Sequence, residues 1–289
     1  MDGFINLLKP TGMSSAQAVG FVKRALQVKK IGHAGTLDPL ASGVLPIMLG
    51  RATKLFEAMQ HRQKEYICEL HFGFETDTLD ADGGVIHSSA YIPSNAEIDS
   101  VLPLFWGDIK QIPPSYSALK HQGSRMYELA RKGISFDIPQ RDTTVFGIKR
   151  LNDIKDGRVR IAVKCKSGFY VRSLCRDIGL SLGSRAYMSM LIRRSVGDFC
   201  LSDARSIEEL QAYIDNKDKS FILPLDHALR HIPACNVEES QLRRLCNGVS
   251  LPYTLPDGSY RIYGSETFIG LAKAEKQMLR METLLKLWR

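Results

Sequence analysis

The most informative stretch of this chain is residues 32–55, GHAGTLDPLASGVLPIMLGRATKL. A single carboxylate, Asp38, lies there among glycine and proline residues, and an apolar run at 44–49 follows it. Because glycine and proline allow backbone angles that other residues resist, the segment can turn tightly and let a large ligand approach the main chain. The apolar run can be buried at the base of the turn, which would hold Asp38 in a fixed position.

Asp38 has two interpretations at this point. A fixed carboxylate beside a histidine, here His33, is what acid–base or nucleophilic chemistry requires. Asp-Pro followed by a glycine is also a common turn signature, and most such aspartates only hydrogen-bond locally. This segment alone favours a local, structural role for Asp38 in the turn, whereas the remainder of the sequence favours the chemical role.

The composition is that of an ordinary globular protein. The chain has 289 residues, of which 44% are hydrophobic and 24% charged, so it can bury a large core in one or two domains. No apolar run reaches the roughly 18 residues of a spanning helix. The start, MDGFINLLKPTGMSS, places Lys9 and Pro10 after a short apolar patch. We therefore expect neither a signal peptide nor a membrane span, and a cytoplasmic protein.

The cysteines and known motifs give no sign of a cofactor. Six cysteines, at positions 68, 165, 175, 200, 235 and 246, are scattered without a Cys-x-x-Cys pair or a Cys/His cluster. Structural zinc is therefore not expected, and reduced thiols are expected in a cytosolic protein. The sequence has no Walker loop, no GxGxxG and no HExxH. We predict no cofactor and no metal site.

The net charge of +8 is unevenly distributed. The formal charge is +5 over residues 1–66, −7 over 67–119, +10 over 120–200 and zero over 201–289. Two basic blocks that flank an acidic one suggest a basic face for a polyanion, with nucleic acid the leading candidate. A charge surplus is weak evidence by itself, because many basic proteins never bind nucleic acid.

The pattern of apolar residues predicts an α+β domain. Helical spacing and capping residues predict helices over 14–28, 95–104, 127–132 and 170–182. Alternating patterns predict strands over 64–74, 143–151 and 158–165, with an acidic loop at 75–84. Because strand pairs are adjacent and helices interrupt them irregularly, a mixed sheet fits better than a doubly wound one.

A second, smaller unit is expected at the C-terminal end. The composition shifts near residues 222–233, and short strands separated by Pro-Asp-Gly and Gly-Ser turns follow. Several short strands at close spacing usually close up, so we predict a small β-barrel of about 60 residues.

Seven motifs carry a resemblance to a known family. They are KPTGMSS (9–15), GHAGTLDPLASGVLPIMLGRATKL (32–55), KEY (64–66), TDTLDADG (76–83), QIPPSYSALKHQGSRMYELARKG (111–133), SGFYVRSLCRDIG (167–179) and LIRRSVGDF (191–199). In order and spacing, over roughly residues 3–200, they resemble the motifs of bacterial tRNA pseudouridine-55 synthases, the TruB family. The C-terminal section resembles the PUA-like RNA-binding barrel of that family.

The resemblance implies a fold and an activity. It implies a pseudouridine synthase fold over residues 1–230, with a mixed, largely antiparallel sheet, flanking helices and a T-arm-binding insertion at about 105–140. A PUA-like RNA-binding domain would occupy 231–289. The implied reaction isomerises the uridine at position 55 in the T loop of tRNA, without cofactor or metal.

The resemblance also implies the central site residues. Asp38 would be the catalytic aspartate, whose carboxylate attacks the sugar, deprotonates it or adds to the base; the sequence leaves these routes open. Arg172 would pair with Asp38 and keep the carboxylate charged and aimed. Tyr66 would stack on the extruded base, which restores on the order of 1–3 kcal/mol of lost stacking.

Further residues are implied to contact the substrate. Tyr170 and Leu191 would line the pocket of the base. His33 would occupy the space vacated by the flipped nucleotide and need not transfer a proton. Lys9 either supports the active-site loops or meets phosphate, and the sequence leaves both open.

Basic residues around the predicted insertion are candidates for phosphate contacts. These are Lys120, Arg125 and Arg131, near a helix that also carries tyrosine. Arg193 is a further candidate, although Ile192 stands where many relatives have an additional arginine, which could weaken a phosphate contact there. Asp77 and Asp80 lie in an acidic loop, and the sequence does not decide their function.

Three functions are compatible with these motifs. The first is a stand-alone synthase that binds the T arm of tRNA as a monomer and requires no protein partner. The second is a tRNA-binding folding chaperone in which catalysis is secondary. The third is a guide-RNA-dependent relative, which is less favoured because the chain lacks long basic tails and has the T-arm insertion.

Overall fold

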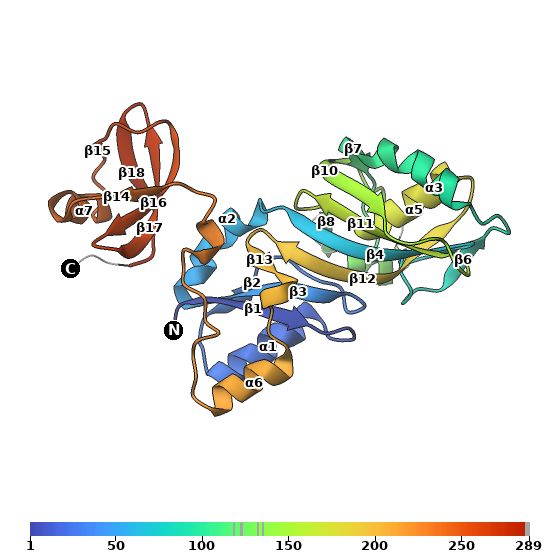
Figure 1. Ribbon diagram of the computed structural model, residues 1–289, viewed down its shortest axis with the longest axis horizontal. Helices are drawn as coiled ribbons and strands as arrows, with labels where there is room; N and C mark the ends of the chain where they lie inside the picture. The colour runs from blue at the N-terminus through green and yellow to red at the C-terminus, as the bar shows by residue number, and fades with distance from the viewer. Residues whose placement is uncertain (118, 122–123, 132, 135, 287–289) are drawn as a thin grey trace.

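The computed structural model describes residues 1–117, 119–121, 124–131, 133–134 and 136–286. Figure 1 shows an elongated molecule, with a large part built on a wide twisted sheet and a small C-terminal part, in orange and red, at one end. The large part contains a nine-stranded sheet and the small part a five-stranded sheet. The predicted α+β class is confirmed.

The large sheet runs in the order β1-β3-β12-β4-β11-β10-β7, with β2 paired to β3 and β13 paired to β12. Its strands are β1 (Gly3–Lys9), β2 (Ile31–His33), β3 (Ser42–Leu49), β4 (Lys64–Phe72), β7 (Gly107–Gln111), β10 (Arg141–Arg150), β11 (Arg158–Cys165), β12 (Ala186–Val196) and β13 (Phe199–Cys200). Among the strand pairings of the described residues in this sheet, only that of β12 with β3 is parallel. The mixed, largely antiparallel sheet is therefore confirmed.

Helices cover this sheet in two groups. The α-helices of the large part are α1 (Ser15–Leu26), α2 (Phe56–Gln60), α3 (Asn95–Val101), α4 (Met126–Arg131), α5 (Val171–Ser181) and α6 (Ile207–Asp215). In Figure 1, α1 and α6 lie beneath β1 and β3, whereas α3 and α5 lie at the opposite end. One core cluster joins side chains of α1, α5 and α6 to the inner face of the sheet, so the two halves share a core.

The predicted elements differ from the observed ones mainly at their ends. The helix expected at 14–28 is α1, which Ser14 starts with a capping box. The helix expected at 95–104 is α3 followed by a 3-10 turn, Leu102–Phe105; Pro103 in this turn has no N–H to donate to an α-helical bond. The strand expected at 64–74 ends at Phe72, because Gly73 turns the chain with a φ of +94°.

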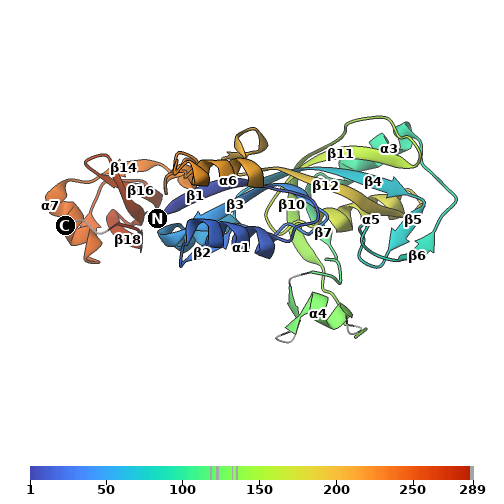
Figure 2. The same cartoon turned by 90° about the horizontal axis from the view of Figure 1, so that it is seen from below.

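Two small hairpins complete the large part. The first pairs β5 (Phe74–Thr76) with β6 (Val85–Ser88), so the predicted acidic loop, 75–84, begins within β5 and ends directly before β6. The second pairs β8 (Lys120–His121) with β9 (Ser124–Arg125) and leads into α4. Figure 2 shows α4 standing away from the body of the molecule. The helix expected at 127–132 is thus α4, while Lys132 lies outside the described residues.

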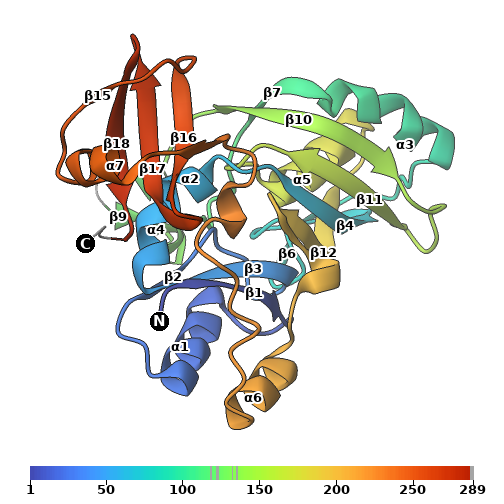
Figure 3. The same cartoon turned by 60° about the vertical axis from the view of Figure 1, so that its left-hand side comes forward.

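The C-terminal part is a curled sheet that forms half a barrel. Its order is β14-β16-β17-β18-β15, which leaves β14 and β15 as its edges within the described residues. The strands are β14 (Ala234–Asn236), β15 (Leu251–Pro252), β16 (Gly258–Gly264), β17 (Thr267–Glu275) and β18 (Met278–Leu284), with α7 (Glu239–Cys246) beside them (Figure 3). A separate cluster, including Leu242, Ile262 and Leu279, forms its core.

The small part is attached to the first strands of the large part. Leu271 and Leu285 are buried in one cluster with Phe4, Met48 and Leu55. The Lys54 ammonium also donates to the carbonyl of residue 284 (3.1 Å). Over the described residues, no helix is both long and apolar enough to cross a membrane.

Candidate active site

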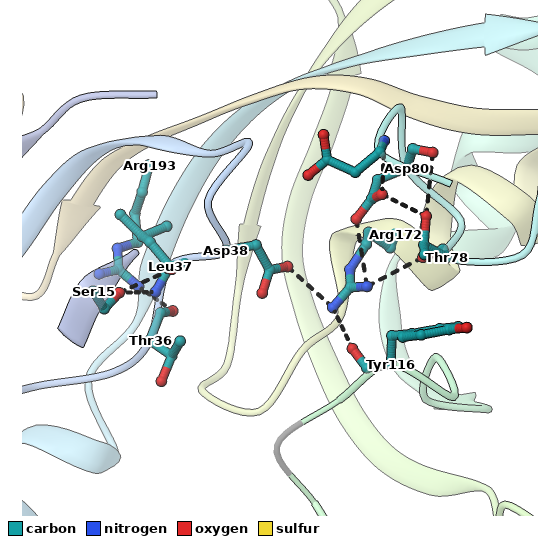
Figure 4. A network of polar contacts seen from close by, with 10 residues as sticks. Ser15, Thr36, Leu37, Asp38, Thr78, Asp80, Tyr116, Arg172 and Arg193 are labelled. Carbon is teal, nitrogen blue, oxygen red and sulfur yellow. Dashed lines mark hydrogen bonds and ion pairs between the residues drawn. The ribbon is translucent and has the colours of Figure 1, made fainter. Parts of the chain in front are cut away.

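The loop that carries Asp38 joins β2 to β3 and is fixed at several points. The Ser15 hydroxyl donates to the Leu37 carbonyl and accepts from the Leu37 N–H, both at 2.8 Å. The Gly12 N–H donates to the Pro39 carbonyl at 2.8 Å. The KPTGMSS motif therefore clamps the backbone on both sides of Asp38, and Figure 4 shows Ser15 against this loop.

The side chain of Arg193 holds the same loop through backbone carbonyls. Its guanidinium donates to the carbonyls of Val44 (2.7 Å), Gly35 (3.1 Å) and Thr36 (3.2 Å). The side chain has no exposed surface, so the expectation that it meets phosphate is corrected: a group shut away from solvent cannot reach the RNA backbone. Burial lowers the pKa of Arg193. Its observed contacts assign it to positioning the Asp38 loop.

Arg172 is the cation that faces Asp38. It is the second residue of α5, and its Nη2 lies 3.0 Å from Asp38 Oδ2. Its Nη1 lies 3.4 Å from Asp80 Oδ2, and it donates to the carbonyls of Thr78 (3.1 Å) and Tyr116 (2.9 Å). Figure 4 shows the guanidinium between the two carboxylates. The pairing expected from the sequence is thus present, with contacts that fix the guanidinium from several sides.

The two carboxylates have different environments. The Asp38 side chain is 37% exposed, whereas that of Asp80 is 7% exposed. Asp80 accepts from the Thr78 hydroxyl (2.6 Å), and its burial raises the pKa of the carboxyl above the ordinary value. Asp77 instead accepts from the Gly84 N–H (2.9 Å) within its own loop. Asp38 is therefore the carboxylate that a ligand can reach, and Asp80 supports Arg172.

Asp38 and Arg172 border two cavities. The smaller, of about 250 Å³, is lined by Thr36, Leu37, Asp38, Lys64, Tyr66, Ser117, Gly168, Phe169, Tyr170, Val171, Arg172 and Leu191. The larger, of about 480 Å³, adds His33, Ser14 and the acidic loop to the same two residues. The smaller cavity joins aromatic and apolar walls to a few polar groups, which suits a flat polar ring.

Three of the predicted pocket residues meet in the smaller cavity. Tyr66 is buried on β4, and burial raises the pKa of its phenol to about 12 despite a hydrogen bond with Arg193. Tyr170 precedes α5, and its backbone N–H and carbonyl are both held by the Gln111 side chain, at 3.1 and 3.2 Å. Leu191, on β12, completes the apolar wall.

His33 and Lys9 have different surroundings from one another. His33 lines the larger cavity, and burial lowers the pKa of its imidazole. Its Nδ1 is buried without a hydrogen-bond partner among the described residues. Lys9 has no exposed surface, and its ammonium donates to the carbonyls of Pro10 (2.8 Å) and Met13 (2.6 Å). Of the two roles left open for Lys9, these contacts support the loops rather than phosphate.

The predicted insertion reaches the site through its first strand and the loop after it. Gln111 fixes Tyr170, Tyr116 accepts from Arg172, and Ser117 lines both cavities. The backbones of Lys120, Arg125 and Arg131 lie in β8, β9 and α4. Their side chains lie outside the described part of the structure, so their predicted phosphate contacts stay predictions.

Sequence reasoning missed three residues of this site. Ser15 stands in the KPTGMSS motif but was not assigned a part in the site, and Gln111 was not singled out. Lys64 stands in the KEY motif, from which only Tyr66 was selected, yet its side chain lines the smaller cavity. Residues two apart on a strand point to the same face, so the spacing of Lys64 and Tyr66 was the available signal. The described residues hold no group of three or more potential metal-ligating side chains.

Two protein-family descriptions match the large part of the chain. The one for the TruB family pseudouridylate synthase, N-terminal domain, matches residues 23–171. The one for the tRNA pseudouridylate synthase B C-terminal domain matches residues 172–230. Together they span the elements that carry Asp38, Tyr66, Arg172 and Leu191.

Curated relatives match most of the length of this chain. It is 40% identical to tRNA pseudouridine synthase B of Clostridium kluyveri, over 98% of this chain and 99% of that protein. The counterpart of Clostridioides difficile is also 40% identical, over 96% and 95% of the two chains. That of Ehrlichia canis is 42% identical over 87% and 85%.

Solved structures share the architecture. A chain of a Cbf5-Nop10-Gar1 complex matches with a TM-score of 0.76 at 27% identity, over 99% of this chain and 85% of that one. A chain of an H/ACA RNP bound to a substrate RNA containing 2′-deoxyuridine matches with a TM-score of 0.75 at 25% identity, over 98% and 85%.

Proposed function

We propose, from the premise that this chain belongs to the TruB family of tRNA pseudouridine synthases, that it isomerises the uridine at position 55 in the T loop of tRNA. Family membership makes the protein an isomerase that acts on tRNA. The position of the target and the role of Asp38 are the parts that we propose. They are supported by the geometry around Asp38.

One observation carries the proposal. Asp38 is the partly exposed carboxylate of its pair, and Arg172 orients it at the boundary of a base-sized cavity. Breaking the glycosidic bond of uridine requires a group that acts on C1′, on C2′ or on the base, and a positioned carboxylate can do each of these. The cavity keeps the detached uracil close while its C5 turns toward C1′.

We assign each pocket residue a role on this basis. Tyr66 offers its ring to the flipped uracil, and Tyr170 and Leu191 close the cavity on its other sides. His33 lies in the adjoining larger cavity, where a neutral imidazole can stack in place of the extruded nucleotide. Arg193 and Lys9 hold the loops, and Asp80 holds Arg172.

We also propose two domains, residues 1–230 for synthesis and 231–289 for RNA binding. The second sheet begins at Ala234 with its own core, which supports a boundary near residue 230. Every side chain that we assign to the reaction comes from the first domain of a single chain, so a monomer suffices for the chemistry. The insertion, whose α4 projects from the body of the molecule (Figure 2), would bind the T arm.

A tRNA transcript with no modifications tests the proposal. We expect one pseudouridine, at position 55, after incubation with the protein, and none in a matched transcript with cytidine at that position. Product elsewhere in the tRNA would contradict the T-loop assignment. Tight binding with no product from either transcript would favour the folding chaperone, the alternative in which catalysis is secondary.

A further inference from the structure

Lys64 lies in the reaction cavity without an assigned part in the chemistry. It is the first residue of β4, and its side chain lines the smaller cavity together with Tyr66 and Asp38. Because Lys64 and Tyr66 are two residues apart on one strand, they face the same side of the sheet. Any base that stacks on Tyr66 therefore lies beside the Lys64 stem.

The ammonium of Lys64 is held in place but is not neutralised. Nζ donates to the Ser167 hydroxyl at 3.2 Å, and no carboxylate pairs with it in the part of the chain that the structure describes. A methyl group built on Gly35 would lie 3.1 Å from Nζ, so the backbone of the Asp38 loop packs directly against this cation. Burial, with a smaller effect of Arg193, lowers the pKa of Lys64 to about 8, so the group is still charged at neutral pH.

Among the described residues, the site has more buried or half-buried cations than carboxylates. Arg172, Arg193, Lys9 and Lys64 surround the loop, Asp38 and Asp80 are its buried or half-buried carboxylates, and Asp82, which also lines the larger cavity, is exposed. The guanidinium groups and Lys9 are occupied by carboxylates and backbone carbonyls. Lys64, with one hydroxyl partner among the described residues, is the cation left for an anion in the cavity.

The proposed reaction creates such an anion on the base. When the N1–C1′ bond breaks, both of its electrons leave with uracil, and the charge spreads to O2 and O4. Asp38 then either bonds to C1′ and is displaced when C5 attacks C1′, or takes the C2′ proton and returns it to C2′ as C5 bonds to C1′. In both routes C5 then loses its proton and N1 gains one. Addition of Asp38 to the base would likewise place the electron pair on the ring and O4.

We propose that Lys64 stabilises the uracil anion during isomerisation, by placing its ammonium at the edge of the base that stacks on Tyr66. This inference rests on the proposed function and deepens it. A cation fixed where charge develops lowers the barrier without reorganisation. Lys64 would therefore affect the rate of the chemical step rather than the affinity of the protein for tRNA.

Two variants of Lys64 and one matched control test this role. We expect Lys64→Met to lower the single-turnover rate of pseudouridine formation by about 10²–10³-fold while the Kd for tRNA stays unchanged. Lys64→Arg keeps the positive charge and should recover much of the rate. The control is Lys164→Met, because Lys164 is on the neighbouring β11 but is 47% exposed and paired with Glu65 (3.3 Å). It should retain the full rate.

The pH profile provides a readout that does not depend on the methionine variant folding. The wild-type rate should fall as pH rises through about 8, where Lys64 loses its proton. Of the groups around Lys64, the pKa values of Tyr66 and Cys165 are raised to about 12, and Arg193 stays charged. Lys9 shares a pKa of about 8, but its ammonium is bound to backbone carbonyls and it does not line the cavity. The fall should therefore move to higher pH in Lys64→Arg.

Several results would overturn the inference. A normal single-turnover rate for Lys64→Met would overturn it. So would a weaker tRNA affinity of Lys64→Met with a normal saturated rate, which would indicate a phosphate contact, or a Lys64→Arg variant no faster than Lys64→Met. If Lys64→Met failed to fold, an unshifted pH profile in Lys64→Arg would overturn the inference. Absence of product from the wild type would overturn the proposed function itself. Product from the wild type, together with an unchanged rate in the Lys64 variants, would overturn only the role of Lys64.

Discussion

At the scale of the residue, the site separates two carboxylates that share one guanidinium. Asp80 is buried against Arg172 and has a raised pKa, while Asp38 reaches the cavities. A buried cation with a carboxylate on each side is held by charge as well as by its backbone acceptors. Removal of the Arg172 guanidinium therefore affects both the orientation of the Asp38 carboxylate and the stability of the fold.

We predict that Arg172→Met destabilises the protein by about 3–5 kcal/mol at pH 7, because it leaves Asp80 buried without its cation. An acid whose folded pKa is above its unfolded value makes the fold more stable as pH falls through the folded pKa. Loss of Arg172 raises the pKa of Asp80 further, so the destabilisation should shrink as pH falls toward 4. Denaturant unfolding at the two pH values measures both effects.

The matched control for that experiment is Lys110→Met. Lys110 is 67% exposed and pairs at 3.0 Å with Asp142, which is 83% exposed. An exposed ion pair contributes about 0–1 kcal/mol, so little change is expected at either pH. Equal losses for Arg172→Met at both pH values would mean that the charge of Asp80 is not the cause.

At the scale of the element, the reaction loop depends on the contact between β3 and β12. Gly43 pairs with Arg193 in the parallel part of the sheet, directly after the Asp38 loop. Gly43 has a φ of +112°, and a Cβ there would lie 2.3 Å from the Arg193 carbonyl oxygen. Glycine is therefore required for both its backbone angle and its lack of a side chain.

We predict that Gly43→Ala reduces stability by more than about 2 kcal/mol and lowers the rate of pseudouridine formation, because the strained strand pulls the Asp38 loop away from Arg193. Thermal unfolding and the single-turnover rate measure the two effects. Gly147→Ala in β10 is the control, since nothing lies within 4 Å of a Cβ there. Similar behaviour of the two alanine variants would contradict this account of the loop.

The sequence was sufficient for elements with a strong local signal. The caps of α1, the alternation of β4 and the helix after Tyr170 were predictable from their own residues. Gly73, by contrast, turns the chain at the end of β4 with a φ of +94°, and its backbone N–H and carbonyl bond to Arg185 and Ser89, which are distant in sequence. A prediction from local pattern has no access to such partners.

The candidate site was predictable to a similar degree. Motif resemblance selected Asp38, Arg172 and Tyr66, which the fold brings to one cavity. Arg193 and Lys9 were expected as phosphate contacts, in full or in part, because a charged side chain is ordinarily exposed. Their burial follows from carbonyl groups that converge only in the folded loop. The catalytic roles themselves stay predictions.

At the scale of the whole molecule, charge is concentrated where RNA is expected to bind. Residues 120–200 carry a formal charge of +10, whereas 67–119 carry −7. The acidic segment contributes Asp80, the β5–β6 hairpin and the start of the insertion, and the basic segment contributes the remainder of the insertion, from residue 120, and β10 to β12. The attraction to tRNA should therefore come from one part of the chain rather than from its modest net charge.

We predict that the Kd for tRNA increases about tenfold or more between 50 and 200 mM salt, because each phosphate contact releases a counterion. Filter binding or fluorescence anisotropy over that range gives the slope of log Kd against log salt. The thermal stability of the free protein over the same range is the control. A Kd that does not change with salt would contradict the electrostatic account of binding.

The most direct test of the central claim compares Asp38→Asn with Asp77→Asn. Asp77 is an aspartate of the nearby loop whose side chain, among the described residues, bonds within its own turn. Single-turnover formation of pseudouridine and the Kd for tRNA are measured for both variants. We predict that Asp38→Asn loses activity on the order of 10⁴-fold or more with Kd unchanged, while Asp77→Asn resembles the wild type. Product from Asp38→Asn at the wild-type rate would contradict the claim that this carboxylate performs the reaction.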